Sequence, residues 1–214
     1  DDTKATPGNY FFYPFARTII MPDCCDIGKW NNRKINYKGY HELAYLHPLY
    51  FNPNINIIDK FNPSRKPYFI LRLAKLDAYH DVGKGGIDDS IVIKLIDILK
   101  DRGDVFITSE RELKPEFEQY RIDIDSNDIF HALYYADMYI GDSQTMAAEA
   151  AVLGTPSIRF NDFIGKIGYL NDLENNYNLT IGIQSSNPNK LLNTIPNLLN
   201  TKELKQKWII NRDR

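Results

Sequence analysis

The residues best suited to chemistry lie in a short polar turn, Gly-Asp-Ser-Gln-Thr at positions 141–145. The turn joins a predicted strand to a predicted helix. Asp142 or Ser143 can cap that helix, which leaves its first backbone N–H groups and the positive end of its dipole facing outward. A phosphate suits such a helix start, and the hydroxyls of Ser143 and Thr145 would add hydrogen-bond donors. The turn is therefore a candidate phosphate site.

Glu149 extends this candidate site along the helix. It lies four residues after Thr145, on the same helix face and one turn deeper. A carboxylate there can accept hydrogen bonds from both hydroxyls of a ribose whose phosphates sit at the helix start. An ordinary capped core helix with a solvated glutamate explains the pattern equally well. The residue types alone leave both interpretations open.

A second candidate is the glycine-rich loop at positions 78–86, which reads Ala-Tyr-His-Asp-Val-Gly-Lys-Gly-Gly. Gly83 permits a tight backbone approach to a ligand, and Lys84 supplies positive charge. The loop is not a Walker loop, because Gly85 follows the lysine where a serine or threonine is required. We therefore expect Gly83 and Lys84 to contact substrate without forming a P-loop.

His80 and Asp81, in the same loop, are the candidate catalytic pair. With His41 before them and many aspartates after them, they also fit a metal-dependent phosphohydrolase. That class of enzyme is all-helical, whereas strands and helices alternate in this chain. A lone His-Asp pair is more often a local hydrogen-bond pair. The hydrolase is thus the weakest of the hypotheses, and no metal site is predicted.

A third candidate follows the apolar run at 105–107, where the sequence reads Thr-Ser-Glu at 108–110. Glu110 and, further along the chain, His131 can line the same cleft as the first two turns. On its own, each also fits a structural role. Glu110 or Ser109 can cap a helix, and His131 can be a partly buried, hydrogen-bonded side chain.

From Pro67 onward, short apolar runs alternate with helical periodicity. This alternation predicts an α/β, Rossmann-like domain with a parallel sheet, in which ligands bind at the carboxyl ends of the strands. Gly103 and Gly154 fall where glycines that end helices belong. Strands are predicted near 68–71, 105–107, 138–140 and 157–158, and helices near 87–99, 115–120, 129–135, 144–153 and, as a pair, from 188 onward.

The first part of the chain follows a different pattern. A predicted helix at 5–16 and a predicted strand at 18–21 precede a turn-rich stretch through Asn36 and a helical patch within 37–46. We expect residues 1–66 to be the remnant of an N-terminal domain and its linker. Residues 67–214 are expected to form the nucleotide-binding domain with its C-terminal helices.

The amino-acid composition excludes several classes of protein. Hydrophobic residues make up 43% and charged residues 25%, which is globular composition, and the net charge of −2 argues against a general nucleic-acid binder. Cys24 and Cys25 are adjacent, so their geometry disfavours a disulfide, and no second cysteine pair exists for zinc. No apolar run approaches the length that spans a membrane. These features predict a reduced, cytoplasmic protein.

Several stretches together resemble one known family. They read Lys-Gly-Tyr-His-Glu-Leu-Ala-Tyr-Leu-His-Pro at 38–48, His-Asp-Val-Gly at 80–83, Thr-Ser-Glu at 108–110, Tyr-Tyr-Ala-Asp at 134–137 and Thr-Met-Ala-Ala-Glu-Ala-Ala-Val-Leu-Gly-Thr-Pro at 145–156. Asp-Asp-Thr at 1–3 also fits, as an internal motif of a longer protein. The family is catalogued as domain of unknown function 354, and the resemblance spans nearly the whole chain.

That family is similar to UDP-N-acetylglucosamine 2-epimerase and the wider glycosyltransferase-B group, in which two Rossmann-like domains enclose the active site and the second domain holds the nucleotide sugar. The resemblance implies that Ser143 holds the diphosphate, that Glu149 holds the ribose and that His80 contacts a phosphate or sugar. The epimerases have two glycines where this chain has Gln144 and Thr145. Side chains at these positions restrict the closest approach of the backbone to a pyrophosphate.

The leading hypothesis is a glycosyltransferase or epimerase-like enzyme of polysaccharide synthesis that uses a nucleotide sugar, UDP-linked in the first instance, without another cofactor. The alternative is a non-catalytic nucleotide-sugar-binding or assembly module. Because 214 residues hold one such domain plus a connector, we expect the C-terminal half of a two-domain protein. An apolar surface around Phe11, Phe12, Tyr13 and Phe15 is expected to be exposed and to allow homo-oligomers to form.

Overall fold

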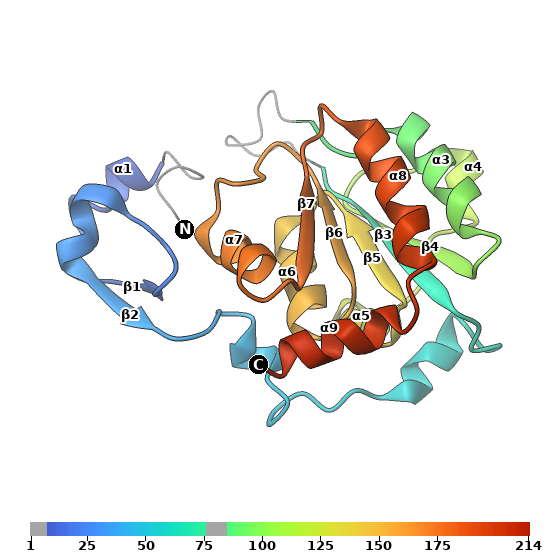
Figure 1. Cartoon of the computed structure of the whole chain (residues 1–214), viewed down its shortest axis with the longest axis horizontal. Helices are drawn as coiled ribbons and strands as arrows, with labels where there is room; N and C mark the ends of the chain where they lie inside the picture. Colours follow the sequence, from blue (N-terminus) through green and yellow to red (C-terminus); the bar gives the residue numbers. More distant parts are fainter. Residues whose placement is uncertain (1–7, 76–84) are drawn as a thin grey trace.

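A five-stranded parallel sheet forms the centre of the molecule in the computed structural model, which describes residues 8–75 and 85–214 (Figure 1). The strands lie in the order β4-β3-β5-β6-β7, and each neighbouring pair is parallel. Their bounds are β3 Tyr68–Leu73, β4 Asp104–Ser109, β5 Met138–Gly141, β6 Ser157–Phe160 and β7 Thr180–Ile183. The predicted α/β fold with a parallel sheet is therefore confirmed.

Helices cover both faces of this sheet. The helices of this part of the chain are α3 Asp89–Leu99, α4 Pro115–Glu118, α5 Ile129–Tyr135, α6 Gln144–Val152, α7 Gly168–Asn175, α8 Pro188–Leu199 and α9 Leu204–Arg212. One buried cluster joins Tyr68 and Ile70 to α5, α6 and α7. A second joins Phe69 and Leu71 to α3 and α8. Successive residues of β3 thus point to opposite faces, and both are buried, which explains the continuous apolar run in the sequence.

The order of the strands fixes where a ligand would bind. Numbered from β3, the order is 2-1-3-4-5, and the chain winds in opposite directions on the two sides of the gap between β3 and β5. Ligands of open α/β sheets bind outside the carboxyl ends of the strands at such a switch point. In register, Arg72 of β3 pairs with Gly141 of β5, so these two residues mark that place.

The N-terminal part forms a small unit of its own to one side of the sheet (Figure 1). It contains α1 Asn9–Phe12, η1 Gly28–Arg33 and a two-stranded parallel sheet of β1 Ile19–Pro22 and β2 Lys34–Tyr37. The expected turn-rich stretch through Asn36 therefore holds a 3-10 helix and most of a strand. Its core is one small cluster, consisting of Tyr13, Ile19, Met21, Cys25, Ile27 and Trp30.

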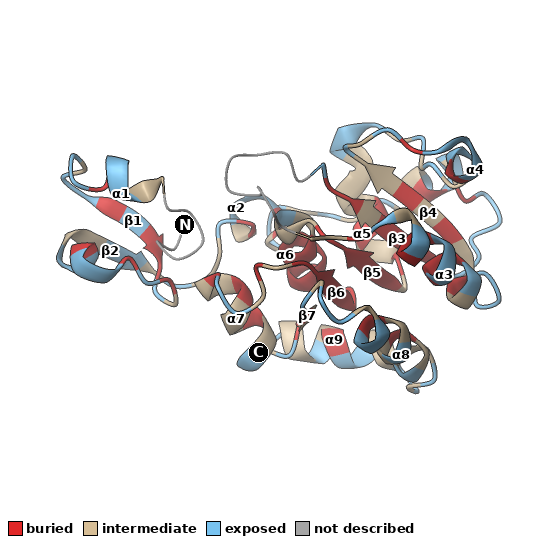
Figure 2. Cartoon of the chain, turned by 90° about the horizontal axis from the view of Figure 1, so that it is seen from above, coloured by how far each residue is buried: buried red, intermediate tan, exposed pale blue. Residues whose placement is uncertain are grey.

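The aromatic surface predicted here is partly confirmed. Phe11, Phe12 and Phe15 are 77%, 72% and 89% exposed. Tyr13 is a correction, because only 9% of it is exposed and its ring packs edge-on against Trp30 with centroids 5.6 Å apart. Figure 2 shows the contrast between this unit, with much exposed surface, and the buried central strands.

Two predictions about local structure need correction. Helix α3 ends at Leu99, and Gly103 is not a left-handed cap. A Cβ at Gly103 would lie 2.3 Å from the Pro67 carbonyl oxygen, so the glycine serves a close backbone approach. Helix α7 and strand β7 were not predicted at all. Gly154, by contrast, has a φ of 80° and ends α6 as expected.

A connecting segment joins the two units and packs beside the sheet. It holds α2 Leu43–Leu46 and η2 Ile55–Lys60. Leu46 and Ile58 are buried in the same cluster as residues of α5 and α6, so this segment is part of the main core.

Neither Cys24 nor Cys25 forms a disulfide within the described residues. Within the described ranges, no helix is long and apolar enough to cross a membrane, and no group of three or more acidic, histidine or cysteine side chains could hold a metal ion.

Candidate functional site

Ser143 caps helix α6 at the carboxyl edge of β5. Its backbone is extended, and its Oγ accepts a hydrogen bond from Met146 N at 3.4 Å. The backbone N–H groups of Gln144 and Thr145 have no acceptor among the described residues. Thr145 is exposed, and Gln144 is half-buried. The start of α6 therefore offers free donors next to the switch point, as an anion site requires.

Asp142 supports the carboxyl edge through two backbone contacts. Its side chain is buried, and its two carboxylate oxygens accept hydrogen bonds from Ala74 N at 2.6 Å and Ile87 N at 3.1 Å. Burial raises the pKa of Asp142 to about 6, and these backbone bonds oppose the rise. The carboxylate therefore holds Ala74 and Ile87 beside the end of β5. Its contact with a substrate stays a prediction.

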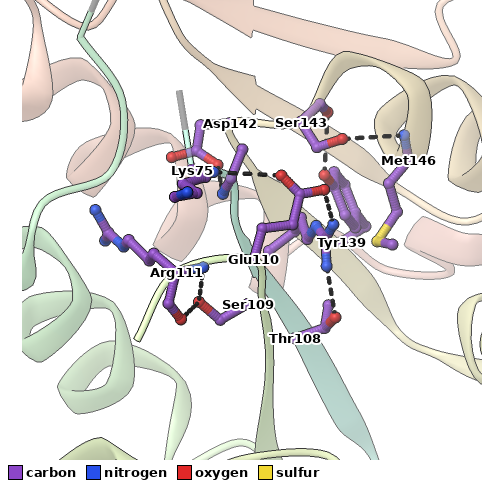
Figure 3. A network of polar contacts seen from close by, with 11 residues as sticks. Lys75, Thr108, Ser109, Glu110, Arg111, Tyr139, Asp142, Ser143 and Met146 are labelled. Carbon is purple, nitrogen blue, oxygen red and sulfur yellow. Dashed lines mark hydrogen bonds and ion pairs between the residues drawn. The ribbon is translucent and has the colours of Figure 1, made fainter. Parts of the chain in front are cut away.

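Arg72 lies between the neighbouring strand ends and was not predicted as a site residue. Its guanidinium donates to Thr108 Oγ1 at 2.8 Å and forms an ion pair with Glu110 (Figure 3). Its Nε is buried without a partner in the part of the chain that the structure describes. The signal available in the sequence was a charged residue inside the apolar run of β3. Its positive charge lies at the edge where α6 begins.

Glu110 is half exposed and accepts a second hydrogen bond, from Lys75 N at 3.3 Å (Figure 3). The carboxylate is therefore the partner that holds Arg72 in the present arrangement. Glu110 and Ser143 both lie at the carboxyl edge of the sheet, and a cleft that they share stays a prediction. Direct contact with a substrate stays a prediction.

Gly141 allows these groups to approach one another. A Cβ at this position would lie 2.3 Å from Tyr139 Oη and 2.8 Å from Arg72 Cβ. The Tyr139 hydroxyl lies next to Gly141 and donates a hydrogen bond to Ser143 O at 3.1 Å. Any larger residue at 141 would displace either the tyrosine or the arginine.

Glu149 lies in α6, facing the connecting segment. It is 7% exposed, and its Oε1 accepts a hydrogen bond from Tyr45 Oη at 2.9 Å. Burial raises the pKa of Glu149, while the Tyr45 bond and the charges of His41 and Arg72 oppose the rise. No basic side chain forms an ion pair with it among the described residues. The carboxylate is thus held by a phenol that is itself 38% exposed.

The other predicted residues fall into two groups. His131 lies on α5, where its ring stacks on Phe51 with centroids 5.0 Å apart and its Nδ1 accepts a hydrogen bond from Asn54 N at 3.1 Å. These contacts match the structural alternative for His131. Four residues, His80, Asp81, Gly83 and Lys84, lie outside the described residues.

The fold defines the class of this protein: a Rossmann-like α/β domain similar to the domains of glycosyltransferase-B enzymes. The calicheamicin glycosyltransferase CalG4 matches with a TM-score of 0.51 and 12% identity, over 97% of this chain and 50% of that one. The wall teichoic acid polymerase TagF matches with a TM-score of 0.50 and 16% identity, over 97% of this chain and 54% of that one. The chain thus spans about half the length of both.

At the level of sequence, the chain belongs to the family described as "Protein of unknown function (DUF354)", whose model matches residues 1–213. The resemblance noted in the sequence is thereby confirmed for this family. No curated protein matches the chain significantly.

Proposed function

We propose that this chain binds a nucleotide sugar and acts as the nucleotide-binding half of a glycosyltransferase or an epimerase-like enzyme. The diphosphate would lie at the start of α6, and the ribose would lie against Glu149. The acceptor or the second part of the active site would come from another domain of comparable size. Residues 1–66 would then be the end of that domain and its linker.

The observation that carries the proposal is the free start of α6 at the switch point. The N–H groups of Gln144 and Thr145, which have no acceptor within residues 8–75 and 85–214, lie at one edge with the Ser143 hydroxyl and the Arg72 guanidinium. This combination of donors and positive charge favours a phosphate group. Glu149 lies on the same helix, four residues after Thr145, and the proposal places the ribose of the same nucleotide against it.

The proposal also specifies which nucleotide to test first. Both solved structures described above belong to glycosyl-transferring or polymerising enzymes, and the TagF structure is described as containing CDPG. We propose a UDP-linked sugar of a polysaccharide pathway as the first ligand to test, with CDP-linked compounds next.

The second candidate function is a non-catalytic nucleotide-sugar-binding or assembly module. One observation favours it: the Glu149 carboxylate is already hydrogen-bonded to Tyr45 Oη. Binding without turnover by the longest natural form of the protein would support this alternative.

The test is a binding screen of the chain by thermal shift and isothermal titration calorimetry with UDP-, GDP-, CMP- and dTDP-sugars. We expect selective binding of one nucleotide class and a loss of roughly tenfold or more in the Glu149→Gln variant, because an amide accepts hydroxyl bonds less strongly than a carboxylate. The matched control is Glu118→Gln, an exposed glutamate paired only with Arg121 three residues away. Equal affinities of wild type and Glu149→Gln would contradict the proposed site.

A further inference from the structure

Glu42 is a buried acid without a hydrogen-bond partner. Its side chain is 0% exposed, and neither carboxylate oxygen accepts a hydrogen bond from any described residue. Burying a carboxylate in this way is costly, and native proteins rarely leave such a group unsatisfied. Glu42 lies within the Lys-Gly-Tyr-His-Glu-Leu motif at 38–43, to which the proposed function assigns no role.

The nearest opposite charge comes from the preceding residue. His41 Nδ1 lies 3.3 Å from Glu42 Oε2, and the His41 side chain is 59% exposed. The imidazole also packs edge-on against Tyr169, with ring centroids 6.1 Å apart. Its Nε2 has no partner in the described parts of the chain. One side of the ring therefore faces a buried acid, and the other is open to a ligand.

The same pair lies close to Glu149. Tyr45, one turn after His41, donates to Glu149 Oε1 at 2.9 Å. The charge of His41 lowers the pKa of Glu149, and the charge of Glu149 adds to the burial that raises the pKa of Glu42. The three side chains therefore interact electrostatically across the contact between α2 and α6.

We propose that His41 and Glu42 complete the ribose part of the nucleotide site, with Glu42 orienting the His41 imidazole and His41 sharing the two ribose hydroxyls with Glu149. This inference rests on the proposed function, since it places a ribose at Glu149. Glu42 is a positioning residue in this arrangement, and His41 and Glu149 are the ligand contacts.

The chemistry of the groups matches a vicinal diol. In the neutral form of the His41 imidazole, a proton on Nδ1 directed at Glu42 leaves Nε2 as an acceptor, and Glu149 supplies carboxylate oxygens. Each ribose hydroxyl can donate to one of these acceptors. A 2′-deoxy nucleotide lacks one hydroxyl and leaves a largely desolvated acceptor unpaired, which is a strong basis for discrimination. The site should therefore prefer ribonucleotides to their deoxy forms.

The experiment compares the affinity for UDP with that for 2′-deoxyuridine diphosphate, and CDP with its 2′-deoxy form, by isothermal titration calorimetry. We expect wild type to bind the ribonucleotide about tenfold or more tightly. In His41→Ala and Glu42→Gln, we expect this ratio to fall to about threefold or less. His47→Ala is the matched control, because His47 lies in the same segment and its imidazole accepts a local hydrogen bond from Leu49 N at 3.1 Å. Its ratio should equal that of wild type.

The outcomes separate the two proposals. If wild type binds neither UDP nor CDP, the proposed function fails for these nucleotides. If wild type binds them but shows no preference for ribose, or if His41→Ala keeps the full preference, the inference alone is overturned. Should Glu42→Gln lose its cooperative unfolding transition, His41→Ala decides the question, since its side chain is mostly exposed.

Discussion

The amino and carboxyl edges of the central sheet differ in whether their polar groups are hydrogen-bonded. At the amino edge, the Lys205 ammonium donates to the carbonyl oxygens of Tyr134 and Ala136 at 2.6 and 2.7 Å, and Asp137 Oδ2 accepts from Tyr68 N at 2.9 Å. At the carboxyl edge, the start of α6 keeps free N–H groups, and Arg72 Nε has no partner in the described chain.

This difference suggests that the amino edge serves folding and the carboxyl edge serves ligand binding. The paired groups of the amino edge contribute to folding, because they satisfy polar atoms that would otherwise be left without partners. The carboxyl edge carries donors and charge that folding alone does not explain. Substitutions at the two edges should therefore affect different measurements, and Asp142 is the informative exception because it is a satisfied group within the carboxyl edge.

The largest effect on stability is expected for Asp142→Asn. The amide keeps one acceptor oxygen but places an NH2 group against one of the two backbone N–H donors, from Ala74 and Ile87. We expect a loss of roughly 3 kcal/mol in the free energy of unfolding at pH 7.5, from charged hydrogen bonds of about 1.5–3 kcal/mol each. Chemical denaturation measures it. Asp125→Asn is the control, since asparagine caps a helical turn as well as aspartate does.

The amino edge is tested by Lys205→Met. The substitution removes the two hydrogen bonds that the ammonium donates to the Tyr134 and Ala136 carbonyl oxygens, so we expect a loss of about 2 kcal/mol in stability and no change in nucleotide affinity. Lys207→Met, at an exposed position of the same helix, should change neither. A marked loss of nucleotide affinity in Lys205→Met would contradict the division between the two edges.

A pH titration of stability tests the buried acid beside the carboxyl edge. Burial raises the pKa of Glu42 to about 7 from an unfolded value near 4.5, so the folded state holds this proton more tightly. The stability from Glu42 is therefore present below pH 4.5 and is lost as the pH rises through about 7. Between pH 6 and 8, wild type should lose about 1.3 kcal/mol more than Glu42→Gln. Parallel curves for the two proteins would show that Glu42 is not buried in its charged form.

The smallest effect on stability is expected for Thr145→Ala. The side chain is exposed and makes no hydrogen bond to the described residues, so stability should change by less than about 0.5 kcal/mol. If its hydroxyl contacts a phosphate, nucleotide affinity should fall roughly threefold, as for the loss of one neutral hydrogen bond of about 0.5–1.5 kcal/mol. Calorimetry of the variant and wild type side by side gives both quantities.

Periodicity predicted the sheet well where both faces are buried. The strands beginning at Tyr68 and Met138 and the helix Ile129–Tyr135 follow directly from apolar spacing. Strand β7 was missed because Gly182 interrupts its short apolar pattern. That glycine has a tertiary cause, since a Cβ there would lie 2.8 Å from Glu174 Oε2.

The site was predicted only where local sequence determines it. A serine before an alanine-rich helix is a local signal, and the structure confirms Ser143 as the cap. The roles of Arg72 and Glu42 depend on which distant segments pack beside them. The same holds for Asp142, whose partners lie 68 and 55 residues away. No pattern within the chain reports such contacts.

The two-stranded sheet of β1 and β2 has a consequence for local opening of the chain. The two strands pack on one small hydrophobic cluster. Ile20 of β1 and its partner Ile35 of β2 are 70% and 56% exposed. Two strands with so little buried surface are only marginally stable, whereas β3 and β5 lie between two large clusters. Amide hydrogens of β1 and β2 should therefore exchange with solvent through local unfolding, well before those of β3 and β5, which await global unfolding. Hydrogen exchange would then resolve the chain into two cooperative units, divided within the segment that carries His41 and Glu42.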